Sequence, residues 1–294
     1  MDNILSSCKL CPRKCGDDRL NGQKGFCGAG KSVKIARSAL HFWEEPCISG
    51  KRGSGTVFFS NCTMKCVFCQ NYKISSGGAG HEVSEAELAE KFLELQNDGA
   101  NNINLVTPTH YVPQIITSLE KAKNNGLTLP ILYNTSGYEN VETLKMLDGL
   151  IDIYMPDMKY YSDKYAVKYS LAPDYFNIAS KAVEEMFRQT GKPVFKDGIM
   201  QKGVLVRHLM LPNLLFDTKK IMDYLYKTYG DDIYISIMSQ YTPLDNVKTY
   251  PELNKKLNTR HYDAMVEYCM NLGIKNAFIQ EGDAAKESFI PDFE

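Results

Sequence analysis

The sequence lacks the main features of membrane, nucleic-acid-binding and disordered proteins. Its 294 residues contain 34 Lys and Arg against 35 Asp and Glu, a formal net charge of -1, so there is no basic excess for nucleic acid or an anionic membrane. No apolar run approaches the length of a membrane-spanning helix, and the first residues lack the pattern of a secretory signal peptide. With 44% hydrophobic and 23% charged residues, we expect a folded cytoplasmic protein.

Cysteine is unevenly distributed along the chain. Of nine cysteines, eight fall within the first 69 residues, where an even spread would place about two. Without a secretory signal, clustered thiols are more often metal ligands or redox groups than disulfides. The eight are Cys8, Cys11, Cys15, Cys27, Cys47, Cys62, Cys66 and Cys69, and the ninth is Cys269.

The first 53 residues differ from the rest in amino-acid composition and in apolar periodicity. They are rich in Cys, Gly, Lys and Arg, and no apolar period is sustained until residues 33–36, a short strand candidate. Such a segment can bury little apolar surface, so something else must order it. We therefore predict a Cys-rich metal-binding segment at residues 1–53 and a larger domain at residues 54–294.

From residue 55 onward, short β-rich runs alternate with amphipathic helices. Ser84 and Glu87 form a capping-box signature, Leu88 and Phe92 continue at helical spacing, and Gly99 ends that helix. Strand candidates lie at residues 56–60, 102–106, 131–133, 152–155, 204–209, 233–237 and 277–280, and further helices at residues 113–125, 141–148, 174–190, 217–229 and 259–272.

Repeated strand–helix–strand units predict an α/β fold with parallel strands and crossover helices. The pattern suits a doubly wound sheet or an incomplete barrel. A full eight-unit barrel typically needs about 250 residues, so six or seven units fit better. In both architectures, ligands bind at the carboxyl ends of the strands.

Three cysteines follow the first strand candidate directly. Cys62, Cys66 and Cys69 have the spacing C-x3-C-x2-C, and three thiolates leave a tetrahedral zinc site one ligand short. They can instead hold three irons of a 4Fe–4S cluster and leave the fourth iron open. The alternative is a zinc knuckle with a fourth ligand from elsewhere, for instance Cys47.

This loop, with Phe68 before its third cysteine, resembles the radical S-adenosylmethionine (SAM) superfamily. Residues 53–60, 69–72, 105–110, 134–138 and 207–213 resemble the pyruvate formate-lyase activating enzyme-like branch. The resemblance covers nearly the whole chain and implies a partial (β/α)6 barrel, a 4Fe–4S cluster and SAM bound to its open iron. It also implies reduction by a one-electron donor such as flavodoxin or ferredoxin, and cleavage of SAM to a 5′-deoxyadenosyl radical that takes hydrogen from a substrate.

The resemblance assigns roles to single residues. Asp157 and Lys159 match the D-x-K of the activating enzymes and are expected to be catalytic; the alternative is a surface ion pair of little energy. Arg207 is expected to bind the SAM carboxylate, and the alternative is an internal salt bridge, perhaps to Asp157. The other expected cofactor-binding residues are Asn71, Thr107, Asn134, Thr135 and Met155.

Two strand tips depart from the family pattern. Asn134 stands where an acidic residue is common in activating enzymes, which argues against a bound monovalent cation. The tip at residues 107–110 lacks the Gly-Gly-Glu-like turn that contacts the SAM amine in many members. There, Thr107 would supply an acceptor, and His110 would either reach substrate or cap the next helix. Gln240 and Tyr241 are expected to face the cavity.

Cys8, Cys11, Cys15 and Cys27 form a second set at close spacing. Four thiolates complete a structural zinc site, and they equally hold a second iron–sulfur cluster. Metal binding would supply the folding free energy that this segment otherwise lacks. Zinc is favoured if the segment is a clamp, and a second cluster if it relays electrons.

The sequence therefore predicts a radical SAM oxidoreductase of the activating-enzyme type. Its substrate would be a glycine of a partner glycyl-radical enzyme, or else another peptide or a small molecule. The alternative from another class is a non-catalytic iron–sulfur or metal-binding scaffold. That alternative is weaker, because a scaffold has no need of Asp157, Lys159 and Arg207 beside the cluster cysteines.

Overall fold

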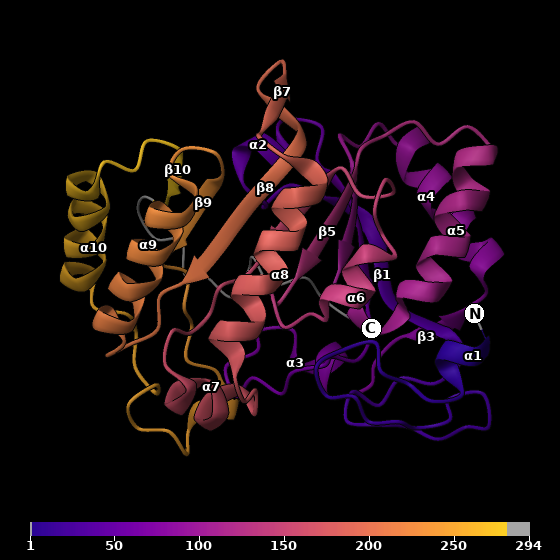
Figure 1. Ribbon diagram of the computed structural model, residues 1–294, viewed down its shortest axis with the longest axis horizontal. Helices are drawn as coiled ribbons and strands as arrows, with labels where there is room; N and C mark the ends of the chain where they lie inside the picture. The colour runs from indigo at the N-terminus through magenta and orange to yellow at the C-terminus, as the bar shows by residue number, and fades with distance from the viewer. Residues whose placement is uncertain (1, 281–294) are drawn as a thin grey trace.

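The computed structural model describes residues 2–280, in which a ten-stranded sheet is covered by helices (Figure 1). The strands are β1 (Val33–His41), β2 (Ser54–Phe59), β3 (His81–Val83), β4 (Ile103–Val106), β5 (Ile131–Thr135), β6 (Ile153–Pro156), β7 (Val194–Lys196), β8 (Ile199–Leu209), β9 (Tyr234–Met238) and β10 (Ala277–Ile279). The α-helices are α1 (Asp2–Leu5), α2 (Pro46–Ser49), α3 (Tyr72–Ser75), α4 (Glu85–Asn97), α5 (Val112–Asn124), α6 (Val141–Lys145), α7 (Asp163–Ser170), α8 (Tyr175–Thr190), α9 (Leu215–Tyr229) and α10 (Thr259–Leu272).

The parallel strands follow one another in chain order. Within residues 2–280 they pair as β2-β4-β5-β6-β8-β9-β10, and the helices α4, α5, α6, α8, α9 and α10 follow the first six of them. Strands β2 and β10 do not pair with each other in this described range, so the barrel is not closed. The predicted partial (β/α)6 barrel is confirmed, with β10 as an additional strand.

Successive side chains on each strand point to opposite faces of the sheet, so each strand contributes to two apolar layers. Leu105, Tyr133 and Val206 point outward into the large core beneath the helices. Leu132 and Leu205, each one residue away on its strand, point inward and form a second apolar cluster inside the barrel. Because both faces are covered, the parallel strands are apolar on both sides, as buried parallel sheets require.

The chain enters the sheet before the first parallel strand. Strand β1, predicted only at residues 33–36, extends to His41 and pairs antiparallel with β2 and β3. Helix α2 then places Cys47 and Ile48 in the inner apolar cluster, where Asn102 Nδ2 donates to the Ile48 carbonyl at 3.0 Å. In the segment predicted at 1–53, residues 33–41 therefore join the sheet and α2 lies in the barrel interior, whereas residues 6–32 contain no helix or strand.

The start of α4 confirms the capping box. The Ser84 hydroxyl accepts from the Glu87 N–H, and the Glu87 carboxylate accepts from the Ser84 N–H at 2.7 Å. Across the part of the chain that the structure describes, no helix combines the length and apolar character needed to span a membrane. Residues 281–294, the end of the predicted domain at 54–294, lie outside the described residues.

Candidate active site

A cavity of about 560 Å3 opens at the carboxyl ends of the parallel strands. This is the edge where ligands bind in parallel α/β folds, and its size is ordinary for a small-molecule site. Its walls come from the β1–α2 loop, the loop after β2 and the strand tips. The polar and cysteine residues that line it include His41, Glu44, Asn61, Cys62, Cys66, Cys69, Gln70, Asn71, Ser75, Thr107, Asn134, Thr135, Ser136, Asp157, Lys159, Arg207, Gln240 and Gln280.

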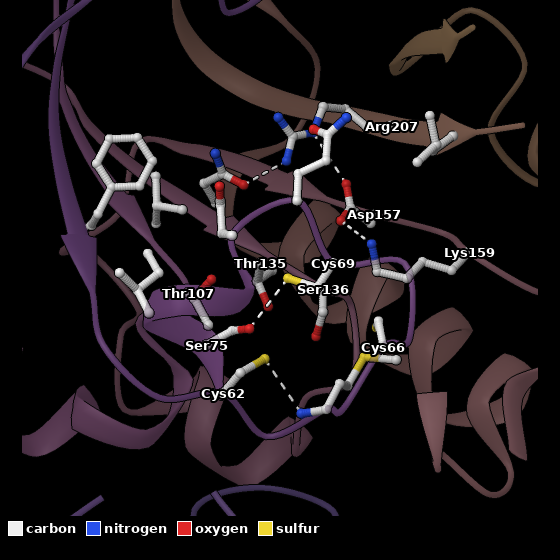
Figure 2. A pocket seen from close by; sticks show the side chains of 18 of the residues that line it. Cys62, Cys66, Cys69, Ser75, Thr107, Thr135, Ser136, Asp157, Lys159 and Arg207 are labelled. Atoms are coloured by element: carbon white, nitrogen blue, oxygen red, sulfur yellow. Dashed lines mark hydrogen bonds and ion pairs between the residues drawn. The ribbon is translucent and has the colours of Figure 1, made fainter. Parts of the chain in front are cut away.

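The three cysteines after β2 surround one space within this cavity (Figure 2). Each sulfur has a hydrogen-bond partner: the Met64 N–H donates to Cys62 Sγ at 3.4 Å, the Ser170 hydroxyl donates to Cys66 Sγ at 3.0 Å, and Cys69 Sγ lies 3.3 Å from Ser75 Oγ. Such contacts orient thiolate ligands and adjust the potential of a cluster they hold. The loop therefore presents a prepared set of three sulfur donors.

This donor set fits a multi-iron cluster better than a single ion. Among residues 2–280, no three His, Cys, Asp or Glu side chains are grouped closely enough to hold one metal ion. Cys47, the suggested fourth zinc ligand, packs instead with Ile48 and Leu132 inside the barrel. Burial raises the pKa of Cys62 to about 12 and that of Cys66 to about 11, so a bound cationic cluster must displace their protons.

A row of ion pairs forms the wall beside the cysteines (Figure 2). Lys159 Nζ lies 2.5 Å from Asp157 Oδ2, and Arg207 Nε lies 3.2 Å from Asp157 Oδ1. Burial alone would raise the pKa of Asp157, but the two cations more than offset it and lower that pKa. The Lys159 and Asp157 side chains are only 16% and 15% exposed, so the pair is not a surface ion pair.

Glu44 completes this row, and no motif or spacing in the sequence indicates its role. Its Oε2 lies 3.1 Å from Arg207 Nη1, and its Oε1 accepts from Asn104 Nδ2 at 2.9 Å. Arg207 Nη2 also donates to Asn134 Oδ1 at 2.7 Å. The internal salt bridge weighed as the alternative for Arg207 is thus present, with Glu44 as a second partner.

The strand tips carry two unusual backbone conformations. Thr107 has φ 60° and Asn61 has φ 75°, in the left-handed region that β-branched residues such as Thr rarely adopt. Both residues line the cavity, and the Thr107 N–H donates to the Asn134 carbonyl at 2.9 Å. Strain of this kind persists where the surroundings fix it, often at functional sites.

A buried carboxyl group joins the tips of β4 and β5. Glu139 Oε1 accepts from the Thr109 hydroxyl at 2.5 Å and from the Thr135 hydroxyl. Burial raises the pKa of Glu139 to about 7, against the lowering effect of these two hydroxyls. Thr135 lines the cavity and Glu139 does not, so Glu139 holds this part of the cavity wall in place through its hydrogen bond to Thr135.

Three residues expected near substrate or cofactor lie elsewhere. Met155 is fully buried in the inner apolar cluster and is not among the residues that line the cavity. His110 lies in a short 3-10 turn with its Nε2 2.8 Å from the Ser60 carbonyl, and burial lowers its pKa to about 3. Tyr241 is buried, with its hydroxyl donating to the Leu253 carbonyl, whereas Gln240 does line the cavity.

The four N-terminal cysteines lie together around a second, smaller cavity. Cys8, Cys11, Cys15 and Cys27 line it with Asp17, Arg19 and His110. The four residues that sequence spacing groups thus line one cavity, and their role as metal ligands stays a prediction.

Comparison with known proteins now identifies the family. The family model of the Radical SAM superfamily matches residues 56–225, from β2 into α9. The chain belongs to the radical SAM superfamily. Members of this superfamily are enzymes, and membership implies a 4Fe–4S cluster and SAM.

Individual relatives of this radical SAM chain are distant. An uncharacterized protein of Methanocaldococcus jannaschii, MJ0674, is 29% identical over 275 residues, which cover 90% of this chain and 75% of that protein. Crystal structures of Streptococcus suis SuiB, bound to the precursor peptide SuiA and bound to SAM, each have a TM-score of 0.50 at 13% and 14% identity. They cover 75% of this chain, which spans about half the length of SuiB, and they show likeness of fold.

Most of the predicted radical SAM site meets in one place. The three cluster cysteines, the catalytic candidates Asp157 and Lys159, and five of the six predicted cofactor-binding residues line the same cavity. Those five are Asn71, Thr107, Asn134, Thr135 and Arg207.

Proposed function

We propose that this radical SAM protein cleaves SAM at a 4Fe–4S cluster held by Cys62, Cys66 and Cys69, and takes hydrogen from a glycine of a partner protein. The substrate class is that of the pyruvate formate-lyase activating enzyme-like branch, which the sequence resembles. The observation that carries the proposal is the single cavity with three sulfur donors facing the ion-pair row. A cluster bound there supplies an open iron for SAM and the electron for its cleavage.

In this proposal, the ion-pair row binds the charged end of SAM. A guanidinium has five N–H donors, and Asp157, Glu44 and Asn134 take one each, so two remain for a carboxylate. Lys159, held by Asp157, adds a second cation near Cys66, where it offsets part of the rise in the Cys66 pKa that burial causes. Asn71, Thr107 and Thr135 would supply hydrogen-bonding groups from the cavity wall.

The residues at the mouth of the cavity support the proposal that the substrate is a polypeptide. Trp43 is 65% exposed there, and Gln70, Gln240 and Gln280 bring amide groups to the same cavity. Gln70 Nε2 donates to the main-chain carbonyl of Gln240 at 3.1 Å, and Gln280 Nε2 donates to the Gln240 side-chain oxygen Oε1 at 3.1 Å. Amides beside an aromatic ring suit an extended peptide backbone, which needs both donors and acceptors.

The test begins with the chain reconstituted anaerobically with iron and sulfide, then reduced and given SAM. Formation of 5′-deoxyadenosine supports SAM cleavage, and a full cluster without that product would favour the scaffold alternative. Incubation with a glycyl-radical enzyme should then give a glycyl EPR signal. Deuterium transfer from another peptide or a small molecule into 5′-deoxyadenosine, without that signal, would replace the glycine assignment. The proposed electron donor, a cytoplasmic flavodoxin or ferredoxin, is tested by using it in place of the chemical reductant.

A further inference from the structure

The segment before β1 is ordered without regular structure or a core of its own. Residues 6–32 contain no helix or strand, and their buried apolar side chains are few: Leu10, Cys11 and Ala29. Nevertheless the segment makes specific contacts with the barrel. Gln114 Nε2 donates to the Lys31 carbonyl and Thr143 Oγ1 donates to the Leu10 carbonyl, both at 2.7 Å. Figure 1 shows this indigo segment at the end of the sheet where α3 lies.

Two of the four cysteines at its centre accept hydrogen bonds from the backbone. The N–H groups of Ala29 and Phe26 donate to Cys27 Sγ and Cys15 Sγ at 3.4 and 3.5 Å. Backbone N–H groups directed at cysteine sulfurs stabilise thiolates that hold a metal. Asp17, which lines the same cavity, has a buried Oδ2 without a hydrogen-bond partner.

The packing at Gly25 shows that the space is already crowded. A Cβ at this position would clash with Asp17 Oδ2 and would lie 2.9 Å from Cys15 Sγ, so a residue larger than glycine does not fit between these groups. The cavity itself measures about 10 Å3, roughly the space of one water molecule. The sulfurs are spread more widely than the ligands of one ion. Binding of a single metal ion must therefore draw the four sulfurs closer together, whereas a larger metal core would fill the wider space between them.

A buried cation next to the cysteines lacks a carboxylate partner. Arg19 is 2% exposed and donates to the carbonyls of Gly30 and His110. Among the described residues it has no salt bridge, and its Nη1 donates to Cys8 Sγ at 3.9 Å. A buried guanidinium needs a compensating negative charge, and a metal centre with four thiolates carries a net negative charge.

We propose that Cys8, Cys11, Cys15 and Cys27 bind a second metal centre that also holds the radical-cluster loop in position. The core is a zinc ion or an iron–sulfur cluster, which share the chemistry of a cationic core on four thiolates. The negative charge of this centre pairs with Arg19, and its binding energy orders residues 6–32. Cys15 is exposed and leaves an entry path for the metal.

Two short routes join this centre to the cluster loop. Arg13, two residues after Cys11, donates from Nε to the Thr63 carbonyl at 3.1 Å, and Thr63 follows Cys62. Arg19 donates to the His110 carbonyl at 2.7 Å. The His110 ring in turn lies 2.8 Å from the Ser60 carbonyl, two residues before Cys62. The second half of the proposal, the link to the radical cluster, rests on the proposed function.

The metal is tested without the radical cluster. A variant with Cys62, Cys66 and Cys69 all replaced by Ala leaves the N-terminal four as the cysteines grouped in the described structure. We expect about one zinc or about four iron per chain in anaerobically prepared protein. Adding Cys15→Ser should remove that metal and lower the melting temperature, whereas adding Cys269→Ser, at a buried site on α10, should leave the metal bound. Absence of both metals at stoichiometric level, after reconstitution with each, would overturn the proposal.

The link to the cluster loop is tested by a variant that keeps all seven cysteines proposed as metal ligands. Arg13→Met removes the donor to Thr63 and should leave the second metal bound, while it alters the EPR spectrum of the reduced cluster with SAM. The exposed Lys9→Ala is the matched control and should leave that spectrum unchanged. Identical spectra for Arg13→Met, Cys15→Ser and the unaltered chain would refute the link. Failure of SAM cleavage would refute the proposed function and leave the metal counts untouched.

Discussion

Arg207 and Glu44 form an ion pair 3.1 Å apart inside the barrel, although 163 positions separate them in the chain. The pair exists because the loop after β1 enters the barrel and brings Glu44 to the carboxyl end of β8. Asp157 contacts the same guanidinium at 3.2 Å, so one cation carries two carboxylates. The pKa of Arg207 is raised, since these carboxylates more than offset the effect of its burial.

Removing the Glu44 charge should destabilise the fold. Glu44→Gln leaves Arg207 with one carboxylate in place of two, and loss of one partner of a buried pair typically costs about 3 kcal/mol. Urea unfolding of the full chain measures the change. Glu120→Gln, at an exposed site on α5, is the control and should shift stability by less than about 0.5 kcal/mol. Equal midpoints for the two variants would show that the pair contributes little.

Loss of one sulfur donor should abolish the chemistry. With Cys66→Ala the cluster loses a ligand, so both the iron–sulfur absorption and 5′-deoxyadenosine formation are expected to disappear. Cys47→Ala removes a thiol that packs in the inner apolar cluster, so it should retain both signals. Measurable product from Cys66→Ala at the unaltered rate would remove Cys66 from the ligand set.

The hydroxyl of Ser170 should tune the cluster potential. It donates to Cys66 Sγ at 3.0 Å and lies 2.7 Å from the Tyr160 hydroxyl. A hydrogen bond to a ligand sulfur stabilises the reduced, more negative cluster, so Ser170→Ala should lower the reduction potential. A spectroscopic redox titration measures the shift, with Ser180→Ala on α8 as control. An unchanged or higher potential in Ser170→Ala contradicts this role.

Stability should depend on pH through Glu139. Its folded-state pKa is about 7 against an ordinary 4.5, so the folded state binds the proton more tightly than the unfolded chain does. This contribution is full below pH 4.5 and is lost as pH rises through 7, a change of about 3 kcal/mol. Glu139→Gln keeps a neutral group and should flatten the pH dependence of urea unfolding.

The control for that titration is Glu142→Gln, whose carboxylate is 83% exposed. It should keep the pH dependence of the unaltered chain. Parallel curves for Glu139→Gln and the unaltered chain would mean that Glu139 does not govern stability in this range.

The repeating part of the fold was predictable from periodicity. Helix α10 has the predicted bounds, Thr259–Leu272, because its apolar stripe and terminal glycine are local signals. Helix α7 was missed: it has only eight residues, and its apolar side chains are divided, with Ala166 buried and Val167 42% exposed. Ser170, at its end, was therefore not foreseen as a partner of Cys66.

Site residues that belong to a local sequence motif were predictable, whereas those brought together from distant segments were not. Spacing located Cys62, Cys66 and Cys69, and a two-residue motif located Asp157 and Lys159. Met155 lies two residues before Asp157 on the same inner face, and one such step is about 6.6 Å along a strand. It therefore lies beneath the cavity among apolar side chains.

Glu44 had no local signal at all. Its partners Asn104, Asn134 and Arg207 lie on three different strands, and only the assembled barrel brings them to it. A contact made solely by tertiary assembly leaves no periodicity or spacing in the sequence.

The insertion of the β1–α2 loop into the barrel has a consequence for biogenesis. This loop leaves the ribosome before any parallel strand, yet the partners of Glu44 and Ile48 reach as far as β8. Until β8 is made, the barrel interior cannot close around it, and such long-range closure is slow. During that interval eight of the nine cysteines are already synthesised and accessible, so this is the period in which metal delivery competes with thiol oxidation.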